Sequence, residues 1–434
     1  MLDLSLSDFG QKLCGPSGIN QLMDDLGKPF PKNCRIVQMG GGNPARIPDV
    51  EKMYRLQMDK ILSIPDEFEN LIGRYDAPQG KLSFIDAVAS YLSKKYNWKI
   101  SRENIAITNG SQSAFFYLFN MFSGKTSCNG VNKTKKIIFP LMPEYTGYAD
   151  QCIENHTIVG IPSEFTIDDD NTFKYHVNFK ILEDYLSSHD DNGAICVTRP
   201  TNPSGNVLTD SEIAKLSMLS KKYGIPLFID NAYGLPWPNI IFTDNAEPYW
   251  DENVVLSMSL SKIGLPSVRT GIIIGEKSII KNISRINAIA ALASGSIGQA
   301  LAQNLIKSGE LISVAENSVR PFYLEKSKKT QEFIHQYFAG TDYKIHKSEG
   351  SIFIWLLLPS LKITTLMFYQ VLKAKGIFVM PGEYFFFGDS VNKDVNIKDH
   401  PHYSKCLRLN YARPEDEIEY GIKSIAEEYK KVMK

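Results

Sequence analysis

Short apolar segments rich in β-branched residues alternate with helical segments along most of the chain, and this alternation constrains the fold more than any other feature. Strands of this kind are typical of a parallel sheet that helices cover on both faces. Helices are predicted at 113–122 and 211–223. The predicted strands, of which we expect the last three to be buried and parallel, span residues 104–108, 136–140, 194–198, 226–230, 254–259 and 271–275. The sequence therefore predicts an α/β domain with a mostly parallel sheet.

The rest of the chain predicts two further regions. A long helical region at 277–336 leads to strands at 351–358, 376–380 and 406–410 and to a final amphipathic helix at 414–434. This pattern favours a smaller α+β domain. The first ~70 residues are rich in glycine, proline and asparagine, and we expect them to be irregular.

The composition excludes several classes of protein. Lysine and arginine together number 48, as do aspartate and glutamate, so the formal net charge is zero and neither a nucleic-acid nor a membrane partner is indicated. Six scattered cysteines without a Cys-x-x-Cys pair predict neither a disulfide framework nor a zinc site. His400, His402 and Cys406 lie in a polar loop, and we expect no metal there. Because no signal peptide or membrane-spanning run is recognisable, we expect a cytoplasmic protein.

Polar residues follow two of the predicted strands at the point where each strand ends. Open α/β sheets bind ligands at this edge. The sequence Asn-Gly-Ser-Gln at 109–112 opens a helix, whose free N–H groups suit a phosphate, although it could also be an ordinary glycine turn. Asp230 follows another strand, where a carboxylate must be hydrogen-bonded or paired with a cation; the alternative is a helix cap.

Three basic residues complete this set. Lys262 follows the strand at 254–259, a position that favours a Schiff-base nucleophile over an exposed surface lysine, and Arg269 adds a second cation for an anionic ligand. Arg408 lies on the polar face of a predicted strand, where it could hold a carboxylate or simply face solvent. Together, a phosphate cradle, a Schiff-base lysine, a carboxylate for a pyridinium nitrogen and an arginine for a substrate carboxylate indicate a pyridoxal phosphate (PLP) site.

The order of these motifs resembles the class I and II aminotransferases of fold type I over essentially the whole chain. The sequences Ser-Met-Ser-Leu-Ser-Lys at 257–262 and Arg-Thr-Gly at 269–271 are similar to the family's lysine signature. Thr-Asn-Pro-Ser-Gly at 201–205 resembles its Asn-Pro-(Thr/Ser)-Gly loop, and Asp230 with Tyr233 resembles its Asp-x-x-Tyr element. Within the family, Gly-Gly-Gly-Asn-Pro-Ala at 40–45 and the seven-residue step from lysine to arginine resemble the valine–pyruvate branch.

The resemblance implies a large PLP-binding α/β domain at 56–310 with a mostly parallel, seven-stranded type of sheet. It also implies an N-terminal arm and part of the small domain at 1–55, and a small C-terminal α+β domain at 311–434. The protein would be a homodimer with shared active sites, to which Tyr75 would contribute across the subunit interface. Lys262 would be the catalytic residue. The implied cofactor-binding residues are Tyr75, Gly110, Ser111, Gln112, Tyr145, Asn202, Asp230, Tyr233, Ser259, Lys262 and Arg269, and the implied substrate-binding residues are Gly42, Asn202 and Arg408.

The resemblance further implies a reaction that moves an amino group between L-valine or L-alanine and pyruvate or 3-methyl-2-oxobutanoate by a ping-pong mechanism. Apolar residues at 19, 236–237 and 385–387 are compatible with small aliphatic substrates, and no second arginine is recognisable for a distal carboxylate. A broader alanine or aromatic aminotransferase and a carbon–sulfur lyase remain alternatives on the same scaffold. A PLP-sensing regulator would need a basic DNA-binding helix pair, which residues 1–60 do not show.

Overall fold

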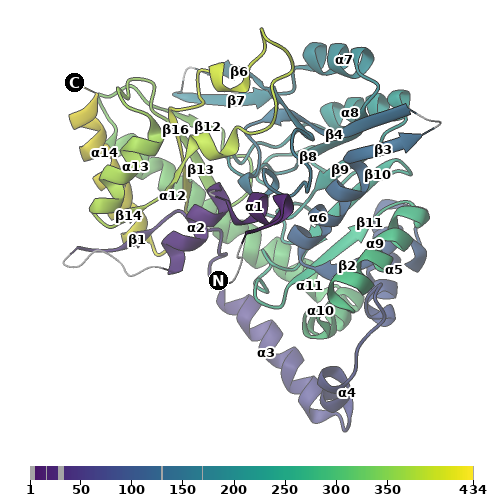
Figure 1. Ribbon diagram of the computed structural model, residues 1–434. Coiled ribbons are helices and arrows are strands. Elements are labelled where there is room, and N and C mark those ends of the chain that lie inside the picture. Colours follow the sequence, from purple (N-terminus) through teal and green to yellow (C-terminus); the bar gives the residue numbers. More distant parts are fainter. Residues whose placement is uncertain (1–4, 16, 28–33, 129–130, 169, 434) are drawn as a thin grey trace.

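The computed structural model describes residues 5–15, 17–27, 34–128, 131–168 and 170–433 (Figure 1). Its larger sheet follows the order β2-β11-β10-β9-β8-β4, and β4 pairs in addition with β5 and β3. The bounds are β2 Ile105–Asn109, β3 Gly124–Cys128, β4 Val131–Met142, β5 Ile158–Pro162, β8 Asn192–Thr198, β9 Leu227–Asp230, β10 Val254–Ser259 and β11 Thr270–Ile274. The predicted α/β fold with a mostly parallel sheet is confirmed. β3 is an eighth strand, antiparallel to β4.

The direction of β11 differs from the prediction. This strand is antiparallel to both of its neighbours, β10 and β2. The connection from Ser259 to Thr270 contains no helix, and it is shorter than the crossover of about a dozen residues that a parallel return requires. The reversal has a consequence for the site: the start of β11, next to Arg269, lies at the same edge of the sheet as the end of β10.

A second sheet follows the order β15-β16-β13-β12-β7-β6. Its strands are β6 Glu164–Ile167, β7 Thr172–His176, β12 Lys344–His346, β13 Phe353–Leu357, β15 Met380–Pro381 and β16 Cys406–Asn410. The hairpin of β6 and β7 lies in the sequence range expected for the large domain, yet β7 pairs in parallel with β12 of this sheet. β1 (Val37–Gln38) likewise pairs with β14 (Ile377–Phe378), which joins the N-terminal segment to C-terminal elements.

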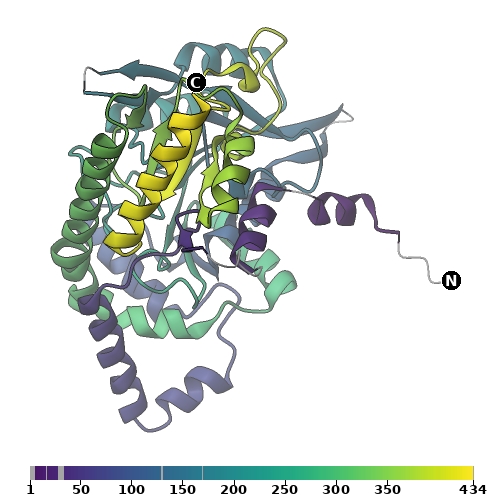
Figure 2. The ribbon, with the colours of Figure 1, turned by 90° about the vertical axis from the view of Figure 1, so that its left-hand side faces the viewer.

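The prediction of an irregular N-terminal region was wrong. The segment contains α1 (Asp8–Cys14), α2 (Gly18–Gly27), α3 (Pro48–Ser63) and α4 (Glu67–Gly73). Helix α3 buries residues at helical spacing, namely Val50, Met53, Tyr54, Gln57 and Ile61, and its proline stands at the first turn, where no backbone hydrogen bond is lost. Helix α1 lies at the outside of the molecule, where its Lys12 donates a hydrogen bond to the carbonyl oxygen of Glu154, and α3 and α4 project from one end (Figure 2).

The remaining helices pack on the sheets and on one another. They are α5 Leu82–Tyr96, α6 Ser111–Phe122, α7 Phe179–Ser188, α8 Asp210–Tyr223, α9 Lys277–Ala291, α10 Ser296–Ser308, α11 Glu310–Val314, α12 Arg320–Tyr337, α13 Thr365–Ala374 and α14 Glu415–Val432. The predicted helices at 113–122 and 211–223 correspond to α6 and α8. In the chain as far as it is described, none of the helices is both long and apolar enough to cross a membrane.

Candidate active site

The carboxyl ends of the central parallel strands open into a cavity of about 540 Å³. Nearly all of the site residues predicted from the sequence line it: Gly42, Ser111, Gln112, Tyr145, Asn202, Asp230, Tyr233, Ser259, Lys262, Arg269 and Arg408. The fold therefore brings together residues that the sequence separates by more than three hundred positions. Gly110 precedes this lining at the start of α6, and Tyr75 lies elsewhere.

Lys262 lies in the turn between β10 and β11. Its Nζ donates a hydrogen bond of 2.7 Å to the carbonyl oxygen of Gly42. Burial and the nearby charges of Arg408 and Arg269 together lower the pKa of this amine to about 8, against the opposing effect of Asp230. A lysine with such a pKa is neutral, and therefore nucleophilic, in a much larger fraction than an exposed lysine at the same pH.

Asp230 stands at the end of β9 and is 6% exposed. Its carboxylate accepts hydrogen bonds from the Tyr148 hydroxyl at 2.5 Å and from the backbone N–H of Ala232 at 3.1 Å. Burial raises the pKa of Asp230 to about 6, although both hydrogen bonds act in the opposite direction. Since both partners are neutral, a cation held beside this carboxylate would stabilise its ionised form.

An anion cradle lies at the start of α6. Gly110 caps the helix with φ of 85°, and a Cβ atom there would lie 2.2 Å from Nη2 of Arg269, so glycine is needed for this close approach. The Ser111 hydroxyl is 3.0 Å from that of Ser257. The Ser259 hydroxyl accepts a hydrogen bond from the backbone N–H of Ser261. Helix N–H groups, hydroxyls and a guanidinium together match the chemistry of a phosphate.

Arg408 is on β16 and is 1% exposed. Nη1 donates to Oδ1 of Asn202 at 2.8 Å, and Nη2 donates to the carbonyl oxygen of Gly40 at 2.6 Å. The guanidinium carbon lies 4.1 Å from the ring centre of Phe353 and 5.0 Å from that of Phe385. Burial lowers the pKa of Arg408 to about 10. The predicted polar strand face is therefore part of the cavity wall and does not face solvent.

Two aromatic side chains complete the walls. The ring of Tyr145 stands edge-on to that of Tyr148, with 5.1 Å between the ring centres. The ring centre of Tyr233 is 5.5 Å from Nζ of Lys262. Burial raises the pKa of both Tyr145 and Tyr233, so both hydroxyls are protonated at neutral pH. They present neutral rings and hydrogen-bonding groups to the cavity.

Tyr75 does not reach this cavity in its own chain. Its side chain is 84% exposed and lines a separate surface pocket with Arg74, Asp76 and Gly295. Ser267 lines both that pocket and the central cavity, so the two are neighbours.

Sequence reasoning assigned no role to several residues of the cavity or its walls, namely Met23, Glu144, Tyr148, Thr198 and Ala232. The signal for some of them was present. Tyr148 lies three residues after Tyr145 in the loop that follows β4, and Thr198 is the last residue of β8, so both obey the same strand-end rule as Asp230. Met23 comes from α2, in the region that the sequence suggested to be irregular.

The prediction of a polar loop around His400 and His402 was wrong. Both rings are buried, His400 beside Phe386 and His402 beside Phe165. Burial lowers the pKa of His400 to about 4 and that of His402 to about 3, so both are neutral at physiological pH. Across the described residues, no group of three histidine, cysteine or acidic side chains has the arrangement of a metal site.

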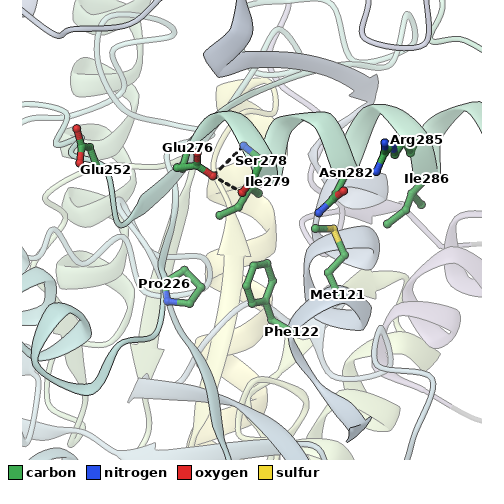
Figure 3. A pocket seen from close by; sticks show the side chains of 10 residues that line it. All are labelled: Met121, Phe122, Pro226, Glu252, Glu276, Ser278, Ile279, Asn282, Arg285 and Ile286. Carbon is green, nitrogen blue, oxygen red and sulfur yellow. Dashed lines mark hydrogen bonds between the residues drawn. The ribbon is translucent and has the colours of Figure 1, made fainter. Parts of the chain in front are cut away.

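Another cavity, of about 620 Å³, contains none of the predicted site residues (Figure 3). Pro226 and Glu252 precede β9 and β10, so it lies at the amino ends of these strands, opposite the first cavity. The side chains of Met121 and Phe122 contribute apolar surface, and Glu276 in this cavity accepts hydrogen bonds from Ser278 within its own helix turn. Its lining does not combine a buried carboxylate with a lysine and two arginines, as that of the first cavity does.

Comparisons with known proteins identify the family. The model of aminotransferase class I and II matches residues 65–425. The valine–pyruvate aminotransferase of Escherichia coli (strain K12) is 43% identical over 425 residues, covering 98% of each chain. A crystal structure from Psychrobacter arcticum 273-4, described as an amino-acid aminotransferase, has a TM-score of 0.93 at 41% identity and covers 99% of both chains. That of valine–pyruvate aminotransferase AvtA from Salmonella typhimurium LT2 has a TM-score of 0.84 at 41% identity, over 95% of this chain and 99% of that one. The chain therefore belongs to the class I and II aminotransferases, which are PLP-dependent enzymes.

Proposed function

We propose that this protein moves an amino group between L-valine or L-alanine and pyruvate or 3-methyl-2-oxobutanoate in a two-stage ping-pong reaction. The observation that carries the proposal is the cavity itself, in which Lys262, Arg269 and Arg408 surround a space that also contains the buried carboxylate of Asp230. The 43% identical relative over the whole length is a valine–pyruvate aminotransferase, which supports the choice of substrates.

The side chains of the cavity fit PLP. Lys262 would hold the cofactor covalently, and the start of α6 with Ser259 and Arg269 would hold its phosphate. Asp230 would face the ring nitrogen, because a protonated nitrogen supplies the cation that its neutral hydrogen-bond partners do not. Tyr145, Tyr233 and Asn202 would contact the ring. When bound, PLP supplies a ring that withdraws electrons from the α-carbon of the amino acid.

Lys262 is also the group that moves the proton. With its pKa lowered to about 8, about a tenth of the amine is unprotonated at pH 7 and can accept the proton from the substrate's α-carbon. The hydrogen bond from its Nζ to Gly42 holds the amine on the side of the cavity that also contains Arg408. When the reaction runs in reverse, the same amine returns the proton to the α-carbon.

Arg408 would bind the substrate's α-carboxylate together with Asn202 and Gly42. Its guanidinium is held in place by hydrogen bonds and by two aromatic rings, so the arginine is ordered before the substrate arrives. A preorganised planar guanidinium binds a carboxylate with two parallel hydrogen bonds. Its Nε has no hydrogen-bond partner in the part of the chain described, which leaves donor capacity for a ligand.

The remaining lining supports a small aliphatic substrate. The charged residues of the cavity are Asp230, Lys262, Arg269 and Arg408, and each has a role above, so the described lining offers no further cation to a distal carboxylate. Ile19 and Met23 of α2 add apolar surface. Of the other apolar residues suggested by the sequence, Phe385 contacts Arg408, while Trp237 is fully buried outside the lining.

We further propose a homodimer in which the exposed Tyr75 of each subunit contributes to the partner's cofactor site. The exposure of its ring and the neighbouring apolar residues Ile72 and Ile297 support such a contact. A cytoplasmic location is supported by the buried thiols Cys196 and Cys406, which are unpaired. For the domains we keep the division at 1–55, 56–310 and 311–434, with the hairpin of β6 and β7 assigned to the small domain.

The first experiment is to follow the visible absorbance of the PLP-bound protein while L-valine, L-alanine, L-glutamate and L-aspartate are added separately. We expect valine or alanine to remove the band of the bound cofactor and pyruvate to restore it. A response only to glutamate or aspartate would overturn the proposed substrates. A protein that takes up no added PLP would overturn the proposed function altogether.

A further inference from the structure

One buried carboxyl group connects two walls of the cavity. Glu144 is 1% exposed and lies between β4 and Tyr145. Its Oε1 accepts hydrogen bonds of 2.7 Å from the backbone N–H of Tyr145 and from the hydroxyl of Thr198. Its Oε2 accepts a hydrogen bond of 3.0 Å from the backbone N–H of Thr198. A single side chain thus links the loop after β4 to the end of β8.

The position of this carboxyl group is unfavourable for stability alone. Burial and the nearby charge of Asp230 raise the pKa of Glu144 to about 8, against the effect of its hydrogen bonds. Its three donors are neutral, so no partner cation offsets the cost of burying it. The geometry that Glu144 imposes on its neighbours explains its presence better than any gain in stability.

Both ends of this link lead to functional groups. Through Tyr145 it reaches the ring of Tyr148, whose hydroxyl donates to Asp230. Through Thr198 it reaches the turn at 199–202, since the carbonyl oxygen of Thr198 accepts a hydrogen bond from the hydroxyl of Thr201 at 2.9 Å. The next residue in that turn is Asn202, which accepts from Arg408.

We propose that Glu144 is a positioning residue, which fixes the Tyr145 wall and the Asn202 turn relative to each other in the geometry that the cofactor site requires. The inference rests on the proposed function, because the ligand of the site is PLP. It extends that function to a residue that touches neither cofactor nor substrate and acts through Tyr145 and Thr198.

Glu144→Gln is a sharp test because of the donor pattern. When Glu144 is ionised, both of its carboxylate oxygens accept hydrogen bonds from backbone N–H groups, one of Tyr145 and one of Thr198. An amide has one oxygen and one NH₂ group, so in either orientation one backbone N–H faces another donor. A buried N–H without an acceptor costs enough free energy to weaken the affinity of a site for its ligand by about 10-fold or more.

Glu383→Gln is the matched control. Glu383 is also buried, at 7% exposed, and its carboxylate also accepts hydrogen bonds from a threonine hydroxyl and a backbone N–H, those of Thr365 and Leu366. It does not line the cavity. Glu383→Gln therefore controls for the loss of a buried, hydrogen-bonded carboxylate outside the cavity lining.

The measurements are made at pH 9, above the pKa of Glu144. They are the dissociation constant of PLP from the apoprotein, the visible circular dichroism of the bound cofactor, and the midpoint of thermal unfolding of the apoprotein. We expect Glu144→Gln to weaken PLP binding about 10-fold and to change the dichroism, whereas Glu383→Gln changes only the unfolding midpoint. Equal PLP affinity and dichroism in the two variants would overturn the inference. Absence of PLP binding in the parent protein would instead overturn the proposed function.

Thr198→Val supplies the test if Glu144→Gln does not fold. This nearly isosteric change removes one donor to Glu144 and keeps both backbone donors. We expect a loss of PLP affinity of about 3-fold, with a changed dichroism of the bound cofactor. Affinity and dichroism equal to those of the parent would refute the role of Glu144.

Discussion

The hydroxyl of Tyr148 is the group whose removal most directly tests the electrostatics of the site. Tyr148→Phe deletes the 2.5 Å hydrogen bond to Asp230 and leaves the ring in place. That ring is packed against Phe115, with 4.8 Å between the ring centres, and against Phe139, with 5.8 Å. The fold should therefore tolerate the change, and its effect should fall on the carboxylate.

The size of the effect follows from the charge of the acceptor. A hydrogen bond to a charged group contributes about 1.5–3 kcal/mol, and one pKa unit corresponds to about 1.4 kcal/mol. Loss of the bond should raise the pKa of Asp230 from about 6 by roughly 1–2 units. At pH 7 the ionised fraction of Asp230 would then fall from about nine-tenths to about half or less.

The assay is the dissociation constant of PLP measured from pH 5 to pH 9. Asp230 holds a protonated ring nitrogen only when it is ionised, so affinity declines as the pH falls through its pKa in the free protein. We expect the bend in the plot of log Kd against pH to move upward by roughly 1–2 units in Tyr148→Phe. Tyr185→Phe is the control, because the buried Tyr185 hydroxyl has no hydrogen-bond partner in the described part of the chain and lies outside the cavity. A bend at the parental pH in Tyr148→Phe would refute the reasoning.

Three further outcomes are expected. Lys262→Ala should abolish turnover. PLP should still bind to this variant, but without a covalent link, so that dialysis removes it; turnover near the parental rate would contradict the proposed mechanism. Arg408→Ala should raise KM for the amino acid by about 10–100-fold, because a charge-assisted pair is lost, and an unchanged KM in steady-state kinetics would remove Arg408 from substrate binding. The histidines His400 and His402 have lowered pKa values in the folded protein, so the stability they confer is present above the ordinary histidine pKa and declines as the pH falls toward 4. Thermal unfolding from pH 7.5 to 4.5 should show this decline, and His402→Phe should reduce its slope; equal slopes would contradict it.

Local patterns were enough to predict the central sheet and much of its catalytic edge. The ends of β2, β9 and β10 could be recognised because apolar strands stop abruptly at polar residues. Asp230 and Lys262 were therefore found from local sequence, and the cavity contains both. The direction of β11 was not found, because a strand sequence does not reveal its direction; only the short connection to β10 does.

Features that depend on contacts between distant segments could not be predicted. Helix α3 has helical spacing, but the prolines and glycines around it suggested an irregular chain. The burial of His400 and His402 depends on rings such as that of Phe165, which come from a distant part of the sequence. The link made by Glu144 also depends on Thr198, more than fifty positions further along the chain.

The pairing of β7 with β12 has a consequence for the order in which the protein is made. Thr172 lies opposite Ile345, so the hairpin of β6 and β7 leaves the ribosome long before its partner strand exists. At about 5–20 residues per second, the intervening chain takes roughly 8–33 s to synthesise. During this interval the hydrogen-bonding edge of β7 that later pairs with β12 is open, and a nascent chain is exposed there to pairing with other strands. The speed of translation across residues 177–343 therefore sets how long this strand edge stays open before the enzyme can fold.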